Sequence, residues 1–367
     1  MKHQTIQEIL AAGVVMAGLT LTQNVRADVE VLFAGGNASQ NVLYDRVTNI
    51  FGSGATLTSV LISPTNSTVR TYKGTLPGQS GLGTVTIDFS LLGAVGGLQD
   101  LANQNNEVTA WTNSLPPTVA VSSTSPEAVA LDPSPFAQTR TLVVPFVFVK
   151  NPAKSPALVN VTNLTQRQAA YLEGGAGYIP ASFFGGTGAS PVYLVARNTA
   201  AAVRTEVDLN VYFSGTISSW VTNQSGYAAL GGVYTTTPIG QPVPDPNGGQ
   251  PNGPSVRAQV NAITNSIGTV AVQDVSTLTP LNYEGVPYSV TNVQNGSYPI
   301  WGYERWAYLK TGQGAPSPNQ LAVINTLLGA VTNANYQATN TVFVGNFVPL
   351  SGLQVDRSSD GGPIFLP

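Results

Sequence analysis

Short apolar runs alternate along this chain with segments in which apolar residues recur every three or four positions. Val29–Ala34 is an apolar run that predicts a buried strand, and it ends in the polar sequence GGNAS. Val42, Val47 and Ile50 come next, at the spacing of one helix face. They predict a helix over Asn41–Phe51. A strand that leads into a helix is the repeating unit of α/β proteins, so this beginning predicts an α/β fold.

Three later apolar runs also predict strands. Thr141–Val149 reads TLVVPFVFV, a continuous β-branched and aromatic run typical of a strand that is buried on both faces. Pro145 lacks a backbone N–H group, so its place in this run indicates a crossing segment or a sheet edge. Ser190–Ala196 and Thr341–Leu350 are the other two predicted strands.

Two helices carry clear start signals. Thr165 and Gln168 form the T-x-x-Q pattern of a capping box, and Gly174–Gly175 is the predicted stop of that helix. Ser317–Pro318 opens a second helix. The apolar face of this second helix consists of Leu321, Ile324, Leu327, Leu328 and Val331.

Arg197 stands at the end of the strand predicted over Ser190–Ala196. The sequence after it predicts a helix whose first turn follows directly on this arginine. The free N–H groups of a helix start beside a cation form a cradle for an anion or a polar ligand. The alternative is a strand-end arginine at the surface that pairs with Asp208 or Glu206.

The first 27 residues have the features of a signal peptide. Lys2 and His3 give a basic start, Ile9–Leu21 is apolar and almost uncharged, and Val25–Ala27 presents small residues to a signal peptidase. The apolar run is too short to span a bilayer. We therefore expect a mature chain from Asp28 that is exported to the periplasm or the cell exterior; the alternative is an uncleaved membrane anchor.

Composition excludes several kinds of chemistry. The chain has no cysteine and its single histidine is His3, so the mature part lacks imidazole and thiolate groups for nucleophilic catalysis or metal binding. Charged residues make up only 9% of the chain. Loss of Lys2, Glu8 and Arg26 with the signal peptide leaves 13 basic and 17 acidic side chains of the original 15 and 18. With no basic patch, nucleic acid is not an expected partner.

Several segments occur in the order found in one protein family. These are LFAGGNASQNVLYDRV from Leu32, GAVGGLQDL from Gly93, VAVSSTSPEAV from Val119, the strand and helix around Arg197, and NSIGTVAVQDV from Asn265 with the later GVP and GSYP. In this order the chain resembles the phosphate-type solute-binding proteins of bacterial ABC uptake systems. The segments cover about two thirds of the mature chain.

The resemblance implies an α/β, two-lobed periplasmic-binding-protein-like (type II) fold with extra strands and loops. Lobe 1 would comprise residues 28–150 and a return over 275–367, and lobe 2 residues 151–274. A small anion or polar solute would lie between the lobes, and an ABC importer permease would be the partner. No catalytic residue, metal or cofactor is implied. The implied ligand-binding residues are Ser39, Gly96, Gly97, Ser123, Thr124, Arg197 and Thr199.

The family pattern is incomplete at the implied site. Ala201–Val203 stands where the family has Ser-Gly-Thr after the arginine, Val95 stands at a serine position, and Thr124 stands at an aspartate position. Each unmet polar group on a desolvated anion costs about 1–3 kcal/mol, against roughly 8 kcal/mol for a micromolar complex. The sequence therefore argues against tight phosphate binding.

Structural roles are open for the same residues. Ser122–Thr124 is equally typical of a hydroxyl-rich turn or a helix cap, and Ser39 of an ordinary turn. The aromatic run Trp301–Tyr308 predicts core packing, with a sugar platform as the alternative, and Glu304 and Arg305 within it are expected to pair or to face solvent.

Two long segments are harder to interpret from the sequence. Residues 52–117 contain extra strands and loops, and residues 233–256 predict a mobile surface insertion without core-forming content.

Two other functions are compatible with the sequence. One is a surface or structural protein on the same fold that has lost ligand binding. The other is an exported hydrolase, which ranks last because no nucleophile with a base is present.

Overall fold

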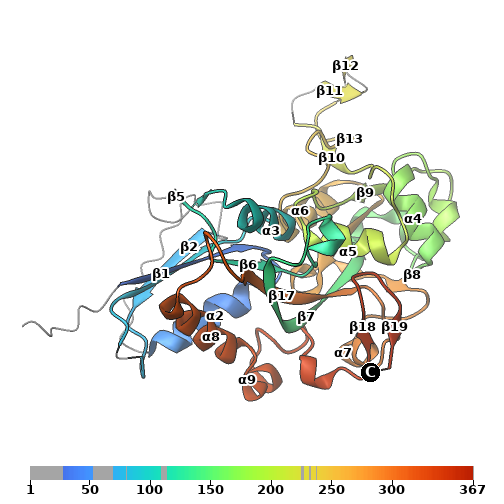
Figure 1. The fold of residues 1–367 in the computed structure, drawn as a ribbon. Coiled ribbons are helices and arrows are strands. Elements are labelled where there is room, and N and C mark those ends of the chain that lie inside the picture. The colour runs from blue at the N-terminus through green and yellow to red at the C-terminus, as the bar shows by residue number, and fades with distance from the viewer. Residues whose placement is uncertain are drawn as a thin grey trace, which may run out of the picture.

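The computed structural model describes residues 28–52, 69–79, 81–108, 114–224, 227–230, 233–236 and 238–366. A nine-stranded mixed sheet runs through the molecule in the order β2-β3-β1-β6-β17-β7-β14-β9, with β15 paired to β7 (Figure 1). Its strands are β1 (Val29–Gly35), β2 (Val69–Gly74), β3 (Val85–Ser90), β6 (Val119–Ser122), β7 (Phe136–Lys150), β9 (Tyr193–Val195), β14 (Ser266–Ala271), β15 (Thr279–Pro280) and β17 (Trp301–Leu309).

Helices cover both faces of the lobe 1 part of this sheet. The strand β6 and the second half of β7 are buried throughout, as expected for strands covered on both faces. The helices α2 and α8 pack together on one face, and α3 lies on the other (Figure 1). The helices are α2 (Gln40–Phe51), α3 (Ala94–Asn103), α4 (Gln166–Gly175), α5 (Ala202–Asn210), α6 (Gly253–Ala262), α7 (Val290–Gln294), α8 (Pro318–Val331) and α9 (Ala334–Thr339).

Short elements complete the described chain. Two-stranded pairs are β4 (Glu107–Val108) with β5 (Ser114–Leu115), β8 (Asn163–Leu164) with β16 (Asn282–Tyr283), β10 (Trp220–Thr222) with β13 (Pro242–Pro244), β11 (Tyr227–Leu230) with β12 (Val233–Thr236), and β18 (Asp356–Arg357) with β19 (Ile364–Phe365). The 3₁₀ turns are η2 (Glu127–Val129), η3 (Pro152–Lys154), η4 (Pro156–Leu158), η5 (Ala181–Phe184), η6 (Val272–Asp274) and η7 (Leu350–Gly352).

The long strand β7 runs through both of the predicted lobes. Its residues Phe136–Pro145 pair with β17, and Phe146–Lys150 pair with β14. Pro145 lies where the strand changes partner, so the sequence correctly indicated a crossing segment. The chain returns toward lobe 1 after β14, through η6. The lobe boundaries at 150 and 274 stay predictions, and the sheet itself is continuous across them.

The helix starts agree with the sequence, because both capping boxes form. Thr165 and Gln168 exchange their hydrogen bonds at the start of α4, and Ser317 and Gln320 do so at the start of α8. The predicted stop of α4 is confirmed, since the helix ends at Gly175.

Two local predictions are wrong. Thr341–Leu350 forms turns and isolated bridges instead of a strand, with Phe343 and Val348 buried and Gly345 in the left-handed region at φ 83°. The helix after Arg197 begins only at Ala202, since residues 198–201 form a turn.

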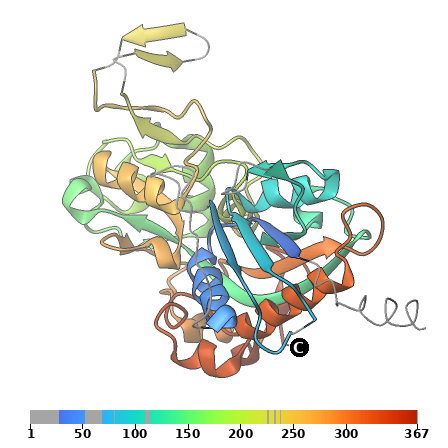
Figure 2. The ribbon, with the colours of Figure 1, turned by 90° about the vertical axis from the view of Figure 1, so that its left-hand side faces the viewer.

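The segment 233–256 has more structure than its composition suggested. It contains β12 and β13, and its end enters α6. Figures 1 and 2 show the pair β11–β12 standing well off the body of lobe 2. The described parts of 52–117 contain β2, β3 and α3, so extra strands are present there as predicted. The predicted signal peptide lies outside the described residues.

Candidate functional site

Three loops of lobe 1 meet at the carboxyl ends of β1, β3 and β6. The Gly36 N–H group donates to Val121 O at 2.7 Å, and the Gly93 N–H group donates to Gly35 O at 2.8 Å. Ligands of open α/β sheets bind at such strand ends. The sequence predictions Ser39, Gly96, Gly97, Ser123 and Thr124 all lie on or directly after these loops.

The N-terminus of α3 faces lobe 2, and a backbone N–H group there is already hydrogen-bonded to a carbonyl oxygen of that lobe. The Val95 N–H group donates to Ala200 O across the predicted lobe boundary at 3.0 Å. A Cβ atom on Gly93 would lie 2.7 Å from the same oxygen, so glycine permits this close approach. The Gly97 N–H group bonds within the helix start to Gly93 O at 2.9 Å. The helix N-terminus therefore holds a protein carbonyl in the position where an anion could bind.

Ser39 is buried and donates its hydroxyl hydrogen to Glu304 Oε1 on β17. Burial raises the pKa of Glu304 to about 7, although Ser39 and Arg305 oppose the shift. The second carboxylate oxygen, Oε2, has no hydrogen-bond partner among the described residues. The expectation that Glu304 and Arg305 pair with each other or face solvent is wrong, because both are buried and bond elsewhere.

The turn after β6 binds a carboxylate from the C-terminal end of the chain. The Ser122 hydroxyl donates a hydrogen bond to Thr124 O at 2.7 Å. This contact belongs to the hydroxyl-rich turn that was one interpretation of Ser122–Thr124 from the sequence. The Thr124 hydroxyl donates to Asp360 Oδ2 at 3.3 Å, and the Ser125 N–H group bonds the same oxygen. Both terminal nitrogens of Arg305 donate to Asp360, Nη2 to Oδ1 at 2.7 Å and Nη1 to Oδ2 at 3.4 Å. A carboxylate is thus present at Thr124, but it comes from position 360.

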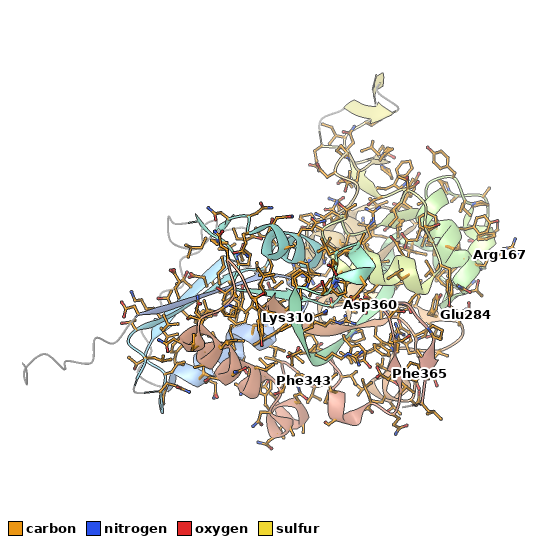
Figure 3. All side chains as sticks on the ribbon, in the orientation of Figure 1. Arg167, Glu284, Lys310, Phe343, Asp360 and Phe365 are labelled. Carbon is orange, nitrogen blue, oxygen red and sulfur yellow. The ribbon has the colours of Figure 1, made fainter. Side chains whose placement is uncertain are left out.

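Ser123 lies in the middle of this turn and is buried. A Cβ atom on Gly302 of β17 would lie 2.2 Å from Ser123 O, so the strand packs directly on the turn. Figure 3 places Asp360 near the middle of the molecule, close to the boundary of the two lobes.

Glu206 of α5 enters the same region from lobe 2. Its side chain is fully buried, and a Cβ atom on Gly302 would lie 3.0 Å from its carboxyl carbon. Neither carboxylate oxygen has a hydrogen-bond partner in the part of the chain that the structure describes. Burial, and then the negative charge of Asp360, raise the pKa of Glu206 well above its ordinary value; Arg357, Arg305 and the Thr124 hydroxyl oppose this shift.

Arg197 is buried within lobe 2 and bonds to backbone carbonyls. Its Nε donates to Gln250 O at 3.2 Å and its Nη2 to Pro251 O at 2.9 Å. Burial lowers the pKa of Arg197 to about 10, and the nearby Asp274 carboxylate raises it. The sequence offered Asp208 or Glu206 as alternative partners of Arg197, and neither pairs with it. Asp208 Oδ2 instead lies 3.8 Å from Arg204 Nε, and Glu206 faces β17 of lobe 1. Thr199 is exposed in the turn after Arg197.

The sequence missed Glu206, Glu304, Arg305, Arg357 and Asp360 as members of this region. One signal could have found Glu304 and Arg305, because only 9% of the residues are charged and each charge in an apolar, aromatic run therefore needs a reason. No comparable local signal marks Glu206, Arg357 or Asp360. The aromatic run of β17 serves the core as predicted: Trp301, Tyr303 and Trp306 are buried.

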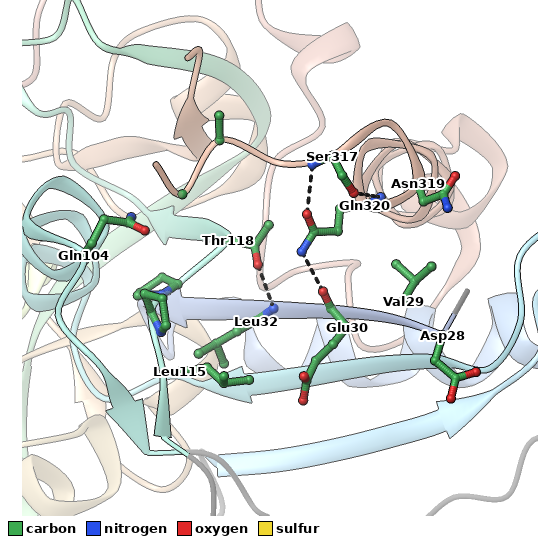
Figure 4. A pocket seen from close by; sticks show the side chains of 14 residues that line it. Asp28, Val29, Glu30, Leu32, Gln104, Leu115, Thr118, Ser317, Asn319 and Gln320 are labelled. Carbon is green, nitrogen blue, oxygen red and sulfur yellow. Dashed lines mark hydrogen bonds between the residues drawn. The ribbon is translucent and has the colours of Figure 1, made fainter. Parts of the chain in front are cut away.

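A separate cavity of about 460 Å³ lies at the opposite, amino-terminal end of β1. Figure 4 shows Asp28, Glu30, Gln104 and Gln320 among its lining residues, with Gln320 Nε2 donating to Glu30 O at 2.8 Å. None of the predicted ligand residues lines it. Within the described residues, no group of three or more acidic or histidine side chains could hold a metal ion, and no helix has the length and apolar character needed to cross a membrane.

The chain is similar in structure to solved solute receptors. A protein of Clostridium perfringens, described as a phosphate ABC transporter substrate-binding protein with bound phosphate, aligns over 88% of this chain and 99% of its own at 12% identity, with a TM-score of 0.56. The chain has the two-lobed α/β fold of the periplasmic binding proteins. This likeness concerns the fold alone, because the identity is low.

Two further solved proteins align less closely. An ABC-type phosphate transport receptor of Vibrio cholerae covers 84% of this chain and 97% of its own at 13% identity, with a TM-score of 0.49. A phosphate-binding protein of Stenotrophomonas maltophilia covers 88% and 91% at 14% identity, with a TM-score of 0.45. No protein-family model and no curated protein matches the chain.

Proposed function

We propose that this protein is an exported, non-catalytic solute-binding protein that holds a small anion or polar solute between its two lobes. The fold supports the proposal, and an ABC importer permease is the partner that suits it. The lobes divide near residues 150 and 274. The solute contacts would come from Ser39, Gly96, Gly97, Ser123, Thr124, Arg197 and Thr199 after the lobes separate.

One observation carries this proposal: the boundary between the lobes buries polar atoms that have no partner among the described residues. Both carboxylate oxygens of Glu206, Glu304 Oε2 and Gln273 Oε1 are such atoms. Gln273 also bridges the boundary, because its Nε2 donates to Asn37 O at 3.3 Å. Each unmet buried group costs about 1–3 kcal/mol, so a boundary that served stability alone would be apolar. A boundary that opens to water and a polar solute accounts for them.

Solute binding then requires opening. Ala200 O holds the start of α3, and two carbonyls hold Arg197, so a solute must displace these protein groups. A solute that binds only after the lobes move apart selects a less populated state, which lowers its apparent affinity. Together with the missing hydroxyls at Ala201–Val203, this predicts phosphate binding weaker than about 1 μM.

Titration calorimetry with inorganic phosphate and with sulfate, at low ionic strength, tests the proposal. We expect weak binding of at least one probe, together with a rise in melting temperature at millimolar concentration. The rise should disappear in Thr124→Val, which keeps the shape but removes the hydroxyl, and persist in the exposed control Thr332→Val. Absence of heat and of any melting shift with either anion would exclude these two solutes, and a shift that survives Thr124→Val would place binding elsewhere.

A second candidate function is a surface or structural protein on the same fold that binds no solute. The contact between Val95 and Ala200 and the carbonyl partners of Arg197 favour it, because they occupy groups that a receptor offers to its ligand. It predicts that the lobes stay closed under all conditions. Solution scattering that shows one unchanged radius of gyration across pH and across a panel of small solutes would favour this candidate over the receptor.

A further inference from the structure

The C-terminal strap, residues 356–365, is bound firmly to lobe 1. Asp360 accepts hydrogen bonds from the Thr124 hydroxyl, from the Ser125 N–H group and from Arg305. Arg357 donates to Pro299 O at 2.8 Å and to Trp301 O at 3.1 Å, and its guanidinium lies 3.9 Å above the Trp301 ring. These contacts hold the strap beside β17.

The same strap also packs on lobe 2. Gly361 has φ 63°, and a Cβ atom on it would lie 2.3 Å from Leu209 Cβ of α5. Arg357 Nη1 lies 3.5 Å from Asn210 Oδ1 at the end of the same helix. The strap therefore bridges the lobes at α5, the helix that carries Glu206.

Glu206 is enclosed between these parts. Arg357 and Asp360 face it from the strap, Arg305 from β17, and the Thr124 hydroxyl from the turn after β6. The arginines are largely engaged elsewhere, Arg305 by Asp360 and Arg357 by carbonyls. The Thr124 hydroxyl donates its hydrogen to Asp360, so the Glu206 carboxylate has charge nearby but no hydrogen-bond partner within the described chain, and burying its ionised form is costly.

We propose that Glu206 and the C-terminal strap form a proton-sensitive latch that keeps the two lobes together when no solute is bound. The latch rests on the proposed function, because it requires two lobes that can separate. In the closed form Glu206 is buried and carries a proton. In the open form it meets water and ionises near its ordinary pKa.

The direction of the pH effect follows from this difference. Burial raises the pKa of Glu206 in the closed form, so closing binds a proton. The closed form is favoured fully below the ordinary pKa of a glutamate, and this preference is lost as pH rises toward the raised value. Low pH closes the lobes and high pH releases them.

Distance measurements between spin labels on the two lobes test the latch without any solute. The chain has no native cysteine, so Asn319→Cys on α8 and Arg167→Cys on α4, both exposed, can be labelled alone. We expect the mean label distance to lengthen between pH 5 and pH 9. In Glu206→Gln, whose amide cannot ionise, it should stay short over the same range. The exposed control Glu127→Gln should keep the pH response of the unsubstituted chain.

Two results would overturn the latch: a label distance that does not change with pH, or the same pH response in Glu206→Gln as in the control. Asp360→Asn serves if Glu206→Gln does not fold. It removes the negative neighbour of Glu206 and frees Arg305, so ionised Glu206 costs less in the closed form and the lengthening of the label distance between pH 5 and pH 9 should shrink. An unchanged lengthening would contradict the latch. The solute titrations remain a separate test, because they can succeed or fail whether or not the lobes respond to pH.

Discussion

Arg197 shows how a predicted ligand residue can also support its own lobe. Its guanidinium holds the carbonyls of Gln250 and Pro251 and faces the Asp274 carboxylate. The segment after β13, which the sequence described as lacking core-forming content, is thereby fixed to the end of β9. An arginine in this position stabilises lobe 2 before any solute arrives.

Arg197→Ala should therefore lower the free energy of unfolding by at least about 1–3 kcal/mol even in the absence of solute, because two buried carbonyls lose a donor. Chemical denaturation of the unliganded protein measures it. The exposed Arg167→Ala should change this free energy by less than about 0.5 kcal/mol. Equal stability of the two variants would show that the carbonyl contacts of Arg197 contribute nothing.

Thr124 and Ser39 belong to hydrogen bonds whose partners are far away in the sequence. Thr124 bonds to a residue 236 positions later, and Ser39 to one 265 positions later. Their identity as hydroxyl residues at strand ends was readable from the sequence. Their partners were not, because no local pattern relates positions at such separation.

At the level of single elements, α3 contains two neighbouring glycines, Gly96 and Gly97, of which one faces open space and the other packs against the backbone of β1. A Cβ atom on Gly97 would lie 2.5 Å from Gly35 Cα, whereas a Cβ atom on Gly96 would have no atom of the described residues within 4 Å. The helix can approach β1 closely only because position 97 has no side chain.

Gly97→Ala should destabilise the protein by about 1–3 kcal/mol or more, since backbone atoms must move to admit the methyl group. Gly96→Ala should instead raise stability by about 0.5–1 kcal/mol, because alanine favours the helix and meets open space. Urea unfolding of both variants measures the difference. A Gly97→Ala variant as stable as Gly96→Ala would contradict the close packing of α3 on β1.

The elements that the sequence predicted well are those whose signals are local. The strand β1, the helix α2 and the capping boxes of α4 and α8 depend on periodicity and on hydrogen bonds between residues three positions apart. Thr341–Leu350 has the apolar composition of a strand, but among the described residues it has no ladder partner beyond isolated bridges. Whether an apolar run becomes a strand depends on a neighbouring strand, which composition does not provide.

The whole molecule buries several acidic groups, and their effects on pH dependence add. Burial raises the pKa of Asp88 to about 6 and those of Glu304 and Asp208 to about 7. Each of these groups stabilises the fold fully below its ordinary pKa near 4, and this contribution is lost as pH rises through the raised value. The lowered pKa of Asp356 acts only at more acidic pH, outside this window.

The free energy of unfolding should therefore fall between pH 5 and pH 8, with a slope of up to about 1.4 kcal/mol per pH unit for each group. Urea unfolding at a series of pH values checks this. Glu304→Gln should reduce the fall, because its amide has no charge to bury. A stability that rises over the same window would show that these carboxyl groups remain ionised when buried.

Local periodicity and helix caps were enough to predict the α/β class, because they depend on residues close together along the chain, where spacing and hydrogen bonding act directly. The two-lobed fold was implied by the resemblance of the segment order to the phosphate-type solute-binding proteins. Packing alone brought the buried charges together: Glu206 from lobe 2, Arg305 from β17, and Arg357 and Asp360 from the strap come from three distant segments. Their pKa shifts and missing partners arise from burial between surfaces that meet only after the chain has folded.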